Sequence, residues 1–554
     1  MTTILQHDSS RSIQAVLILA AAVTGIIFSP FVGSTYWDEI AQYQIGQFNL
    51  NQYALLIDGI FGTSLADSAY SNFDNFVDRD YGSVFEVIIA VLGKIASKAL
   101  PGFDLSHLII LKHIAVYLIF LLGTCSVYAI AKRRIGNAYG GLLAAALFFL
   151  SPRIFGNAFY NSKDIVFLSF FVISVNYILA AAESFRLRSV CLAALFTALA
   201  ASARIIGVFS LFLGIFVFFV SWHRQGLSFR KTSAGIAGFV LLTLMLVYSF
   251  YPFLWPSPVS RMSDIISAMS KFTRHPDIGL FNGRTVQASK KALYLFRWMA
   301  STLPFIFMIA ALFGSLPALA IMLKRTFSLS LWKNNNELCD YVTAGLGICP
   351  VIVSLVKHPW LYDGWRHFYF LVPFLSVSAA VGIFNAASLF AGTKSRKLAA
   401  VWLASVAIAE SLAGILVFFP YPNCYFNASA GSGLIRNYEL DYSGTSGYEA
   451  LVRIISYHGN ISKPINVTSD SIDLRQIRPR LGAARHLINI NEKVMPDYVL
   501  SNRREIPEIE KKLYHEVSSI QTLGGEVIMR ILVPNENRDS YCKSHAQECR
   551  ISVW

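Results

Sequence analysis

The chain has 554 residues, of which 55% are hydrophobic and only 14% are charged, whereas a soluble domain carries roughly 25% charged residues. The missing charge is concentrated in apolar runs such as residues 13–31 and 108–131, each close to the roughly 20 residues that cross a bilayer. The formal net charge of +14 comes from short Lys/Arg clusters between these runs, which is typical of membrane topology signals and not of a nucleic-acid surface. The composition therefore excludes a soluble domain and predicts a polytopic α-helical membrane protein.

The apolar run near the N-terminus, residues 13–31, follows Arg11 and contains three consecutive alanines. A cleaved signal peptide is one interpretation of such a segment. An uncleaved anchor is the other, and we favour it because the run is long enough to cross a bilayer.

Short basic clusters separate the apolar runs and predict the topology. Five of them alternate with less basic loops: residues 132–134, 186–188, 223–231, 324–333 and 394–397. Because cytoplasmic loops carry an excess of Lys and Arg, we place all five on the cytoplasmic side. This placement predicts about eleven transmembrane helices, with the N-terminus inside and the C-terminus outside.

Two segments decide this count. Residues 85–100 are apolar, but a span there would move residues 132–134 to the outer side, so we expect a membrane-surface helix within a large outer loop, 34–106. Residues 190–220 would form a helix of about 46 Å if they were continuous. Arg204 interrupts them, and we therefore expect two short spans with Arg204 at the outer turn.

The composition changes after Pro420. Residues 421–554 are polar and mixed, with short apolar groups spaced along them. We expect two domains: a transmembrane catalytic domain over residues 1–420, and a small extracytoplasmic α/β domain over residues 421–554.

Unusual polar residues fall almost entirely on the predicted outer face, where spans begin or end. Adjacent carboxylates, Asp38 and Glu39, follow the first span, and Asp78 and Asp80 lie further along the same loop. Such groups can also be ordinary solvated loop residues. The candidates in the other outer segments are mostly basic: Arg153, Lys163, Arg204, Arg366 and His367. Two further candidates there are acidic, Asp164 and Asp363.

Cations near helix ends have a simpler explanation, since long side chains at a membrane boundary often only extend to the polar surface. Arg204 differs because it lies between two apolar stretches, where an ionisable residue is costly and usually functional. Carboxylates and cations that meet at one membrane face suit an enzyme that holds a lipid-linked phosphate. Cationic donors bind phosphate, and a carboxylate within hydrogen-bond reach takes the proton of an acceptor hydroxyl.

In their order along the chain, these motifs resemble the GT-C superfamily of integral membrane glycosyltransferases, which includes protein mannosyltransferases and bacterial aminoarabinose transferases. The resemblance covers residues 13–420. It is carried by the Asp38-Glu39 pair, by Lys163-Asp164 at the start of a span, and by segment 366–373, which is similar to a family stretch reading "RYLLP". The chain departs from the family at His367, where Tyr is usual.

The resemblance implies a GT-C fold and transfer of a sugar from a polyprenyl-phosphate donor, with inversion at the anomeric carbon. It implies that Asp38 is the base and that Glu39 is its neighbour or an acceptor-orienting partner. The expected donor-phosphate contacts are Lys163, Arg204, Arg366, His367 and Arg153, and the expected acceptor or sugar contacts are Asp78, Asp80, Asp164 and Asp363. We expect no required cofactor, and the sequence does not indicate a divalent metal.

The expected partners are the lipid-linked sugar donor, a lipid, glycan or protein acceptor, and membrane lipids, without nucleic acid. We expect a bacterial inner membrane, with the site facing the periplasm. Two other classes stay open: a transporter or flippase of a lipid-linked or small anionic substrate, and a membrane scaffold. Transporters usually have internal repeats and helices broken near mid-bilayer, whereas the polar residues here gather at one face. A scaffold would leave the charged residues unexplained.

Overall fold

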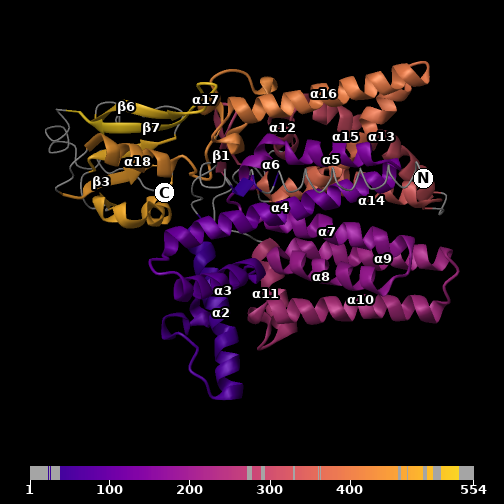
Figure 1. Cartoon of the computed structure of the whole chain (residues 1–554), viewed down its shortest axis with the longest axis horizontal. Helices are drawn as coiled ribbons and strands as arrows, with labels where there is room; N and C mark the ends of the chain where they lie inside the picture. Colours follow the sequence, from indigo (N-terminus) through magenta and orange to yellow (C-terminus); the bar gives the residue numbers. More distant parts are fainter. Residues whose placement is uncertain are drawn as a thin grey trace.

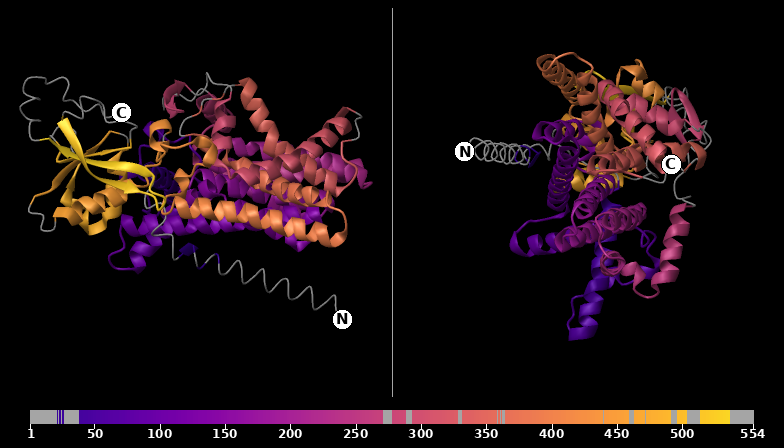
Figure 2. Two further views of the ribbon diagram at one scale, coloured as in Figure 1. Left: turned by 90° about the horizontal axis from the view of Figure 1, so that it is seen from above. Right: turned by 90° about the vertical axis from the view of Figure 1, so that its right-hand side faces the viewer.

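The computed structural model describes residues 38–270, 278–287, 293–327, 331–357 and 364–535, together with residues 21, 23, 25, 26, 359 and 361. Positions 439, 459–462, 471, 491–495 and 503–512 lie outside the described part. Long helices run side by side in a bundle, and a small sheet lies at one end of it (Figure 1). The view from above places the sheet at the same end (Figure 2).

Eight helices of the described residues are long and apolar enough to cross a membrane. They are α4 (Leu105–Ile135), α7 (Asp164–Glu183), α9 (Phe209–Arg224) with the preceding turn η3 (Ile205–Val208), α10 (Phe229–Phe250), α13 (Phe305–Phe327), α14 (Asn335–Lys357), α15 (Val372–Ser388) with the preceding turn η6 (Arg366–Leu371), and α16 (Thr393–Val417). Each coincides with a span expected from the sequence. The prediction of a polytopic α-helical membrane protein is confirmed.

Two further expected spans are shorter apolar helices, α5 (Ala138–Phe149) and α8 (Leu187–Ala203). Helix α8 ends just before Arg204, whose backbone is extended, with φ −144° and ψ 135°. The expected division of residues 190–220 into two helices is therefore confirmed. The first expected span, residues 13–31, lies outside the described residues except at positions 21, 23, 25 and 26.

The basic clusters gather at the end of the bundle away from the sheet (Figure 1). There Arg133 pairs with Glu183 at 2.9 Å and Arg134 with Asp340 at 2.6 Å, so the ends of α4, α7 and α14 are joined. These pairs join the basic cluster 132–134 to carboxylates of α7 and α14.

Helices α13 and α15 pack closely because glycines lie at their crossing. An added Cβ at Gly314 would lie 1.9 Å from the carbonyl oxygen of Ser378, and one at Gly382 would lie 1.9 Å from that of Ala310. Each helix thus carries two small residues four positions apart, a spacing that lets membrane helices approach backbone to backbone. This contact ties α15, which follows the η6 turn, firmly into the bundle.

The loop before α4 contains two helices. Helix α3 (Val84–Ala99) is the separate helix expected there; it buries Phe85 and Ile89 and exposes Ile88 and Val91. Helix α2 (Glu39–Phe61) was not expected, because Gln and Asn residues interrupt its apolar pattern. It runs across the direction of the bundle helices (Figure 1). Helices α2 and α3 pack together, and α3 also contacts α4.

The C-terminal part is a small α/β domain. Its five-stranded sheet has the order β4-β3-β5-β7-β6, in which β3 is parallel to β4 and β5, and β7 is antiparallel to β5 and β6. The strands are β3 (Ile465–Ser469), β4 (Ile488–Asn489), β5 (Tyr498–Ser501), β6 (Tyr514–Gln521) and β7 (Val527–Pro534). Helix α18 (Gly447–His458) packs against β7 and buries Leu451 and Ile454.

The remaining elements are short. They are η1 (Ser68–Tyr70), η2 (Phe73–Asn75), α6 (Pro152–Asn157), η4 (Pro252–Leu254), α11 (Pro258–Ser270), β1 (Ile278–Phe281), β2 (Arg284–Gln287), α12 (Tyr294–Thr302), η7 (Pro422–Cys424), η8 (Ala428–Ala430), α17 (Leu434–Asn437), α19 (Leu474–Ile477) and η9 (Arg478–Leu487). Among them, η9 packs against α4, and α19 packs against α2. The C-terminal domain therefore contacts the helices that begin near the predicted outer face.

Candidate functional site

Arg204 and Asp164 form the buried side of a charged cluster. Asp164 is the first residue of α7, and Arg204 occupies the extended turn after α8, so the two helix ends bring them together. The Arg204 guanidinium forms an ion pair with the Asp164 carboxylate. The other Asp164 oxygen accepts a hydrogen bond of 3.0 Å from the Asn161 side chain, whose own oxygen accepts one of 2.8 Å from the Asp164 backbone N–H.

Arg366 links this pair to Asp38. It lies in η6 with only 4% of its side chain exposed, and its Nη1 is 3.9 Å from Asp164 Oδ2 and 3.8 Å from Asp38 Oδ2. Asp38 is the more accessible carboxylate, since 27% of its side chain is exposed against 2% for Asp164. The buried Asp164 thus anchors two arginines, which favours a supporting role over the expected contact with acceptor or sugar.

Lys163 adds a third cation to the cluster. Its Nζ lies 3.5 Å from the centroid of the Tyr81 ring. Burial, together with the nearby guanidinium groups of Arg204 and Arg366, lowers the pKa of Lys163 to about 7, although Asp38 and Asp164 act in the opposite direction. Burial is the largest of these causes, because it disfavours the charged ammonium. The cluster thus brings three basic side chains, Lys163, Arg204 and Arg366, together with the carboxylates of Asp38 and Asp164.

The loop that supplies Tyr81 is fixed against the Arg204 turn. An added Cβ at Gly82 would lie 2.2 Å from the carbonyl oxygen of Ser202, so only glycine allows this approach. Just before it, Asp80 is 7% exposed and its carbonyl oxygen accepts a hydrogen bond from the Tyr251 hydroxyl. Asp78 is half-buried on the same loop.

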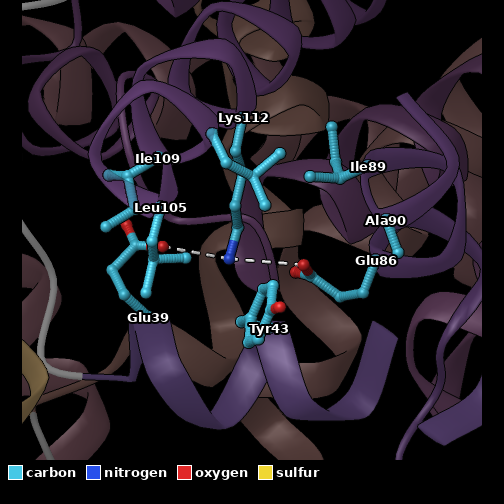
Figure 3. Close-up of a pocket in the computed structure, with 9 residues that line it drawn as sticks. Glu39, Tyr43, Glu86, Ile89, Ala90, Leu105, Ile109 and Lys112 are labelled. Carbon is cyan, nitrogen blue, oxygen red and sulfur yellow. Dashed lines mark ion pairs between the residues drawn. The ribbon is translucent and has the colours of Figure 1, made fainter. Parts of the chain in front are cut away.

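Glu39, although adjacent to Asp38, points into a different environment (Figure 3). It is 2% exposed, with Oε2 3.1 Å from Lys112 Nζ and Oε1 2.6 Å from His113 Nε2. Lys112 also lies 3.3 Å from Glu86, which accepts a 2.6 Å hydrogen bond from the Ser162 hydroxyl. Burial alone would raise the pKa of Glu39, but the charges of Lys112 and His113 outweigh it and lower that pKa.

These contacts leave little free space beside Glu39. The cavity beside Glu39, Glu86 and Lys112 has a volume of only about 10 Å³, which is room for about one water molecule. Glu39 is part of a buried ion-pair network that holds α2 against α3 and α4. Its acceptor-orienting role stays a prediction.

Sequence reasoning missed Lys112, His113 and Glu86. A signal for two of them was available, because Lys112 and His113 interrupt the apolar run 108–131. Ionisable residues inside a predicted span are costly and need partners. Here Lys112 and His113 face the buried carboxylates of α2 and α3.

Arg153 contacts Trp298 and the segment that follows α16. It is 1% exposed, its Nε donates a 2.9 Å hydrogen bond to the Tyr425 carbonyl, and its guanidinium lies 4.7 Å from the Phe426 ring centroid and 5.4 Å from that of Trp298. It thus fixes the segment after α16 to the bundle. The expected contact of Arg153 with the donor phosphate stays a prediction.

The last two expected site residues, Asp363 and His367, flank Arg366 in the sequence. His367 follows Arg366 in η6 and is half-buried. Asp363, expected as an acceptor or sugar contact, lies outside the described residues. Within the described part of the chain, no three His, Cys, Asp or Glu side chains gather as metal ligands would.

Comparison with known proteins gives structural neighbours only. No protein-family model matches the chain, and no curated protein sequence matches it. Among solved structures, ArnT from Cupriavidus metallidurans in the apo state is similar with a TM-score of 0.47 and 10% identity, covering 94% of this chain and 98% of that one. ArnT from the same organism bound to undecaprenyl phosphate has a TM-score of 0.45 and 11% identity, covering 94% of this chain and 97% of that one.

Proposed function

We propose that the protein is an inverting glycosyltransferase of the GT-C type that moves a sugar from a polyprenyl-phosphate donor to a hydroxyl acceptor. The observation that carries this proposal is the position of Asp38, a partly exposed carboxylate whose Oδ2 lies 3.8 Å from Arg366 in a cluster that also holds Lys163 and Arg204. A proton acceptor thus stands next to a site for an anion. Those are the two parts that sugar transfer from a lipid phosphate needs.

The cations account for donor binding and for departure of the phosphate. Arg204 and Arg366 are both held by Asp164, so their guanidinium groups are oriented before a ligand arrives. With Lys163 protonated, the three cations exceed the carboxylates of Asp38 and Asp164 by one charge. A phosphate group binds such a site through charge-assisted hydrogen bonds, which strengthen as negative charge develops on the departing oxygen.

The chemical step follows from this placement. The Asp38 carboxylate takes the proton of the acceptor hydroxyl, and the acceptor oxygen attacks the anomeric carbon. The bond between that carbon and the phosphate oxygen breaks, and its electron pair leaves with the lipid phosphate. Attack from the face opposite the phosphate inverts the anomeric centre. Of the acidic side chains in this region, Asp164 and Glu39 are more deeply buried than Asp38.

The membrane, the acceptor and the need for a cofactor are part of the same proposal. The lipid tail of the donor lies in the membrane, and the acceptor is a lipid, glycan or protein hydroxyl. We place the enzyme in a bacterial inner membrane with this end of the bundle facing the periplasm. The chain's own carboxylate and cations supply the proposed chemistry, so we propose no required cofactor.

The deciding experiment is transfer by purified protein in lipid nanodiscs from radiolabelled polyprenyl-phosphate sugars to a membrane extract. We expect label to appear in acceptor material with wild-type protein and not with Asp38→Asn. Movement of labelled lipid across vesicle membranes without any transfer would instead identify a flippase and overturn the proposal.

A further inference from the structure

Asp38 occupies the N-cap position of helix α2, yet its side chain does not cap the helix. Asp at this position usually accepts a hydrogen bond from the backbone N–H two or three residues later. The Asp38 side chain makes no such bond here, and its Oδ2 faces Arg366 instead. The backbone N–H of Ile40, the second residue of the helix, would normally be the one that the cap satisfies.

The C-terminal domain supplies the missing hydrogen-bond acceptor. Gln476 in α19 accepts a 3.1 Å hydrogen bond from the Ile40 N–H through its side-chain oxygen. We propose that Gln476 is a positioning residue that caps α2 in place of Asp38 and so leaves the Asp38 carboxylate turned toward the cations. The inference rests on the proposed function, because it assigns Asp38 the role of base.

The surrounding contacts hold Gln476 in this position. Helix α19 packs against α2, and the following η9 packs against α4. Arg480 of η9 lies within electrostatic reach of the buried Glu39. At Gly482, where φ is +56°, an added Cβ would lie 3.5 Å from the hydroxyl of Ser106 in α4. The C-terminal domain is therefore docked on α2, which follows Asp38, and on α4.

The proposal predicts a specific response when the hydrogen-bond acceptor on Gln476 is removed. In Gln476→Leu, the unsatisfied Ile40 N–H draws the Asp38 carboxylate into the ordinary capping position and away from Arg366. Misplacement of a reacting group by about 1 Å costs roughly a hundredfold in rate, so we expect kcat to fall about a hundredfold while the donor KM stays unchanged. Gln476→Glu keeps an acceptor oxygen and should restore most of kcat.

A measurement that does not depend on activity tests the capping itself. Hydrogen exchange of a peptide covering the first turn of α2 reports protection of the Ile40 N–H. We expect wild-type protection in Gln476→Leu, where the Asp38 carboxylate can accept the hydrogen bond. We expect the same in Asp38→Ala, where Gln476 still accepts it. The double variant loses both acceptors, and exchange there should be about tenfold faster.

The matched control is Gln521→Leu, an exposed glutamine on β6 of the same domain, which should change neither kcat nor exchange. Wild-type kcat in Gln476→Leu, or wild-type protection in the double variant, would overturn the capping proposal. If the exchange pattern holds but Asp38→Asn turns over normally, the proposed function is wrong while the capping role stands.

Discussion

The Nζ atom of Lys163 lies 3.5 Å from the centroid of the Tyr81 ring. It is within electrostatic reach of both the guanidinium groups and the carboxylates of the charged cluster. Burial and the neighbouring arginines lower its pKa to about 7. In the free protein, Lys163 is therefore mainly neutral above that pH. A bound phosphate would favour the ammonium and raise this pKa.

The first prediction is a pH-dependent donor affinity. Because the complex binds a proton that the free protein has lost above about pH 7, the affinity should be constant below pH 7 and fall by up to about tenfold per pH unit above it. The ligand for this measurement is the sugar-linked donor, a phosphodiester, because a terminal phosphate has a pKa of its own near 6.

Lys163→Arg is the control for that prediction. Arginine stays charged at every pH used, so its affinity should show no slope between pH 6 and 9. A pH-independent affinity in the wild type, or the same slope in Lys163→Arg, contradicts the assignment.

The second prediction concerns Arg366. Arg366→Ala removes a charge-assisted hydrogen bond worth about 1.5–3 kcal/mol, so donor affinity should fall roughly ten- to over a hundredfold. Arg453→Ala, at a guanidinium that is 44% exposed in the C-terminal domain, should leave affinity unchanged. Donor binding by isothermal titration, with thermal unfolding as a folding check, measures both. Full affinity in both Arg366→Ala and Lys163→Ala would rule out the proposed phosphate site.

The third prediction concerns the crossing of α13 and α15. Gly314→Val places side-chain atoms where an added Cβ already lies 1.9 Å from the Ser378 carbonyl oxygen. Overpacking of this kind costs about 1–3 kcal/mol, so the unfolding temperature should fall. Gly345→Val is the matched control, because nothing lies within 4 Å of the Cβ position there. Equal unfolding temperatures for the two variants would mean that the helices separate at little cost.

The fourth prediction concerns the side of the membrane on which the C-terminal domain lies. Residues 394–397 lie at the start of α16 and the domain follows the end of this helix, so the positive-inside rule places the domain outside. Alkaline phosphatase fused after Trp554 should be active in a bacterial host. An inactive fusion, with fluorescence from a cytoplasmic reporter at the same site, would reverse the topology.

Much of the fold could be predicted because a charged side chain inside a bilayer has a high free-energy cost, and this cost can be read from the sequence of each segment alone. Apolar runs located the spans, and Arg204 marked the division between α8 and α9 because a buried cation does not lie unpaired within one helix. The convergence of Lys163, Asp164, Arg204 and Arg366 could also be anticipated. Each lies at the end of a span on one predicted face, and the ends of packed helices meet.

The direction of Glu39 could not be predicted. Successive residues of a helix point about 100° apart, since a turn takes 3.6 residues, so adjacent carboxylates at a helix start face different surroundings. Which one meets the site depends on Lys112 and His113, more than 70 positions away. The contact of Gln476 with Ile40 spans 436 positions, and no local pattern encodes it. Helix α2 itself was missed because buried Gln and Asn residues interrupt its apolar pattern.

The fifth prediction tests the base. Asp38→Asn keeps the size of the side chain and a hydrogen-bonding oxygen toward Arg366, but its amide cannot take the acceptor's proton. Loss of a general base typically costs about 10²–10⁴ in rate, so transfer should nearly vanish while donor affinity persists, since the cations are unchanged. Glu39→Gln should behave differently: it weakens the buried pairs with Lys112 and His113, and should lower the unfolding temperature more than it lowers turnover of the folded fraction. Transfer rate, donor affinity and thermal unfolding of the purified variants separate these effects. Near-normal turnover by Asp38→Asn would remove the base, and with it the proposed mechanism.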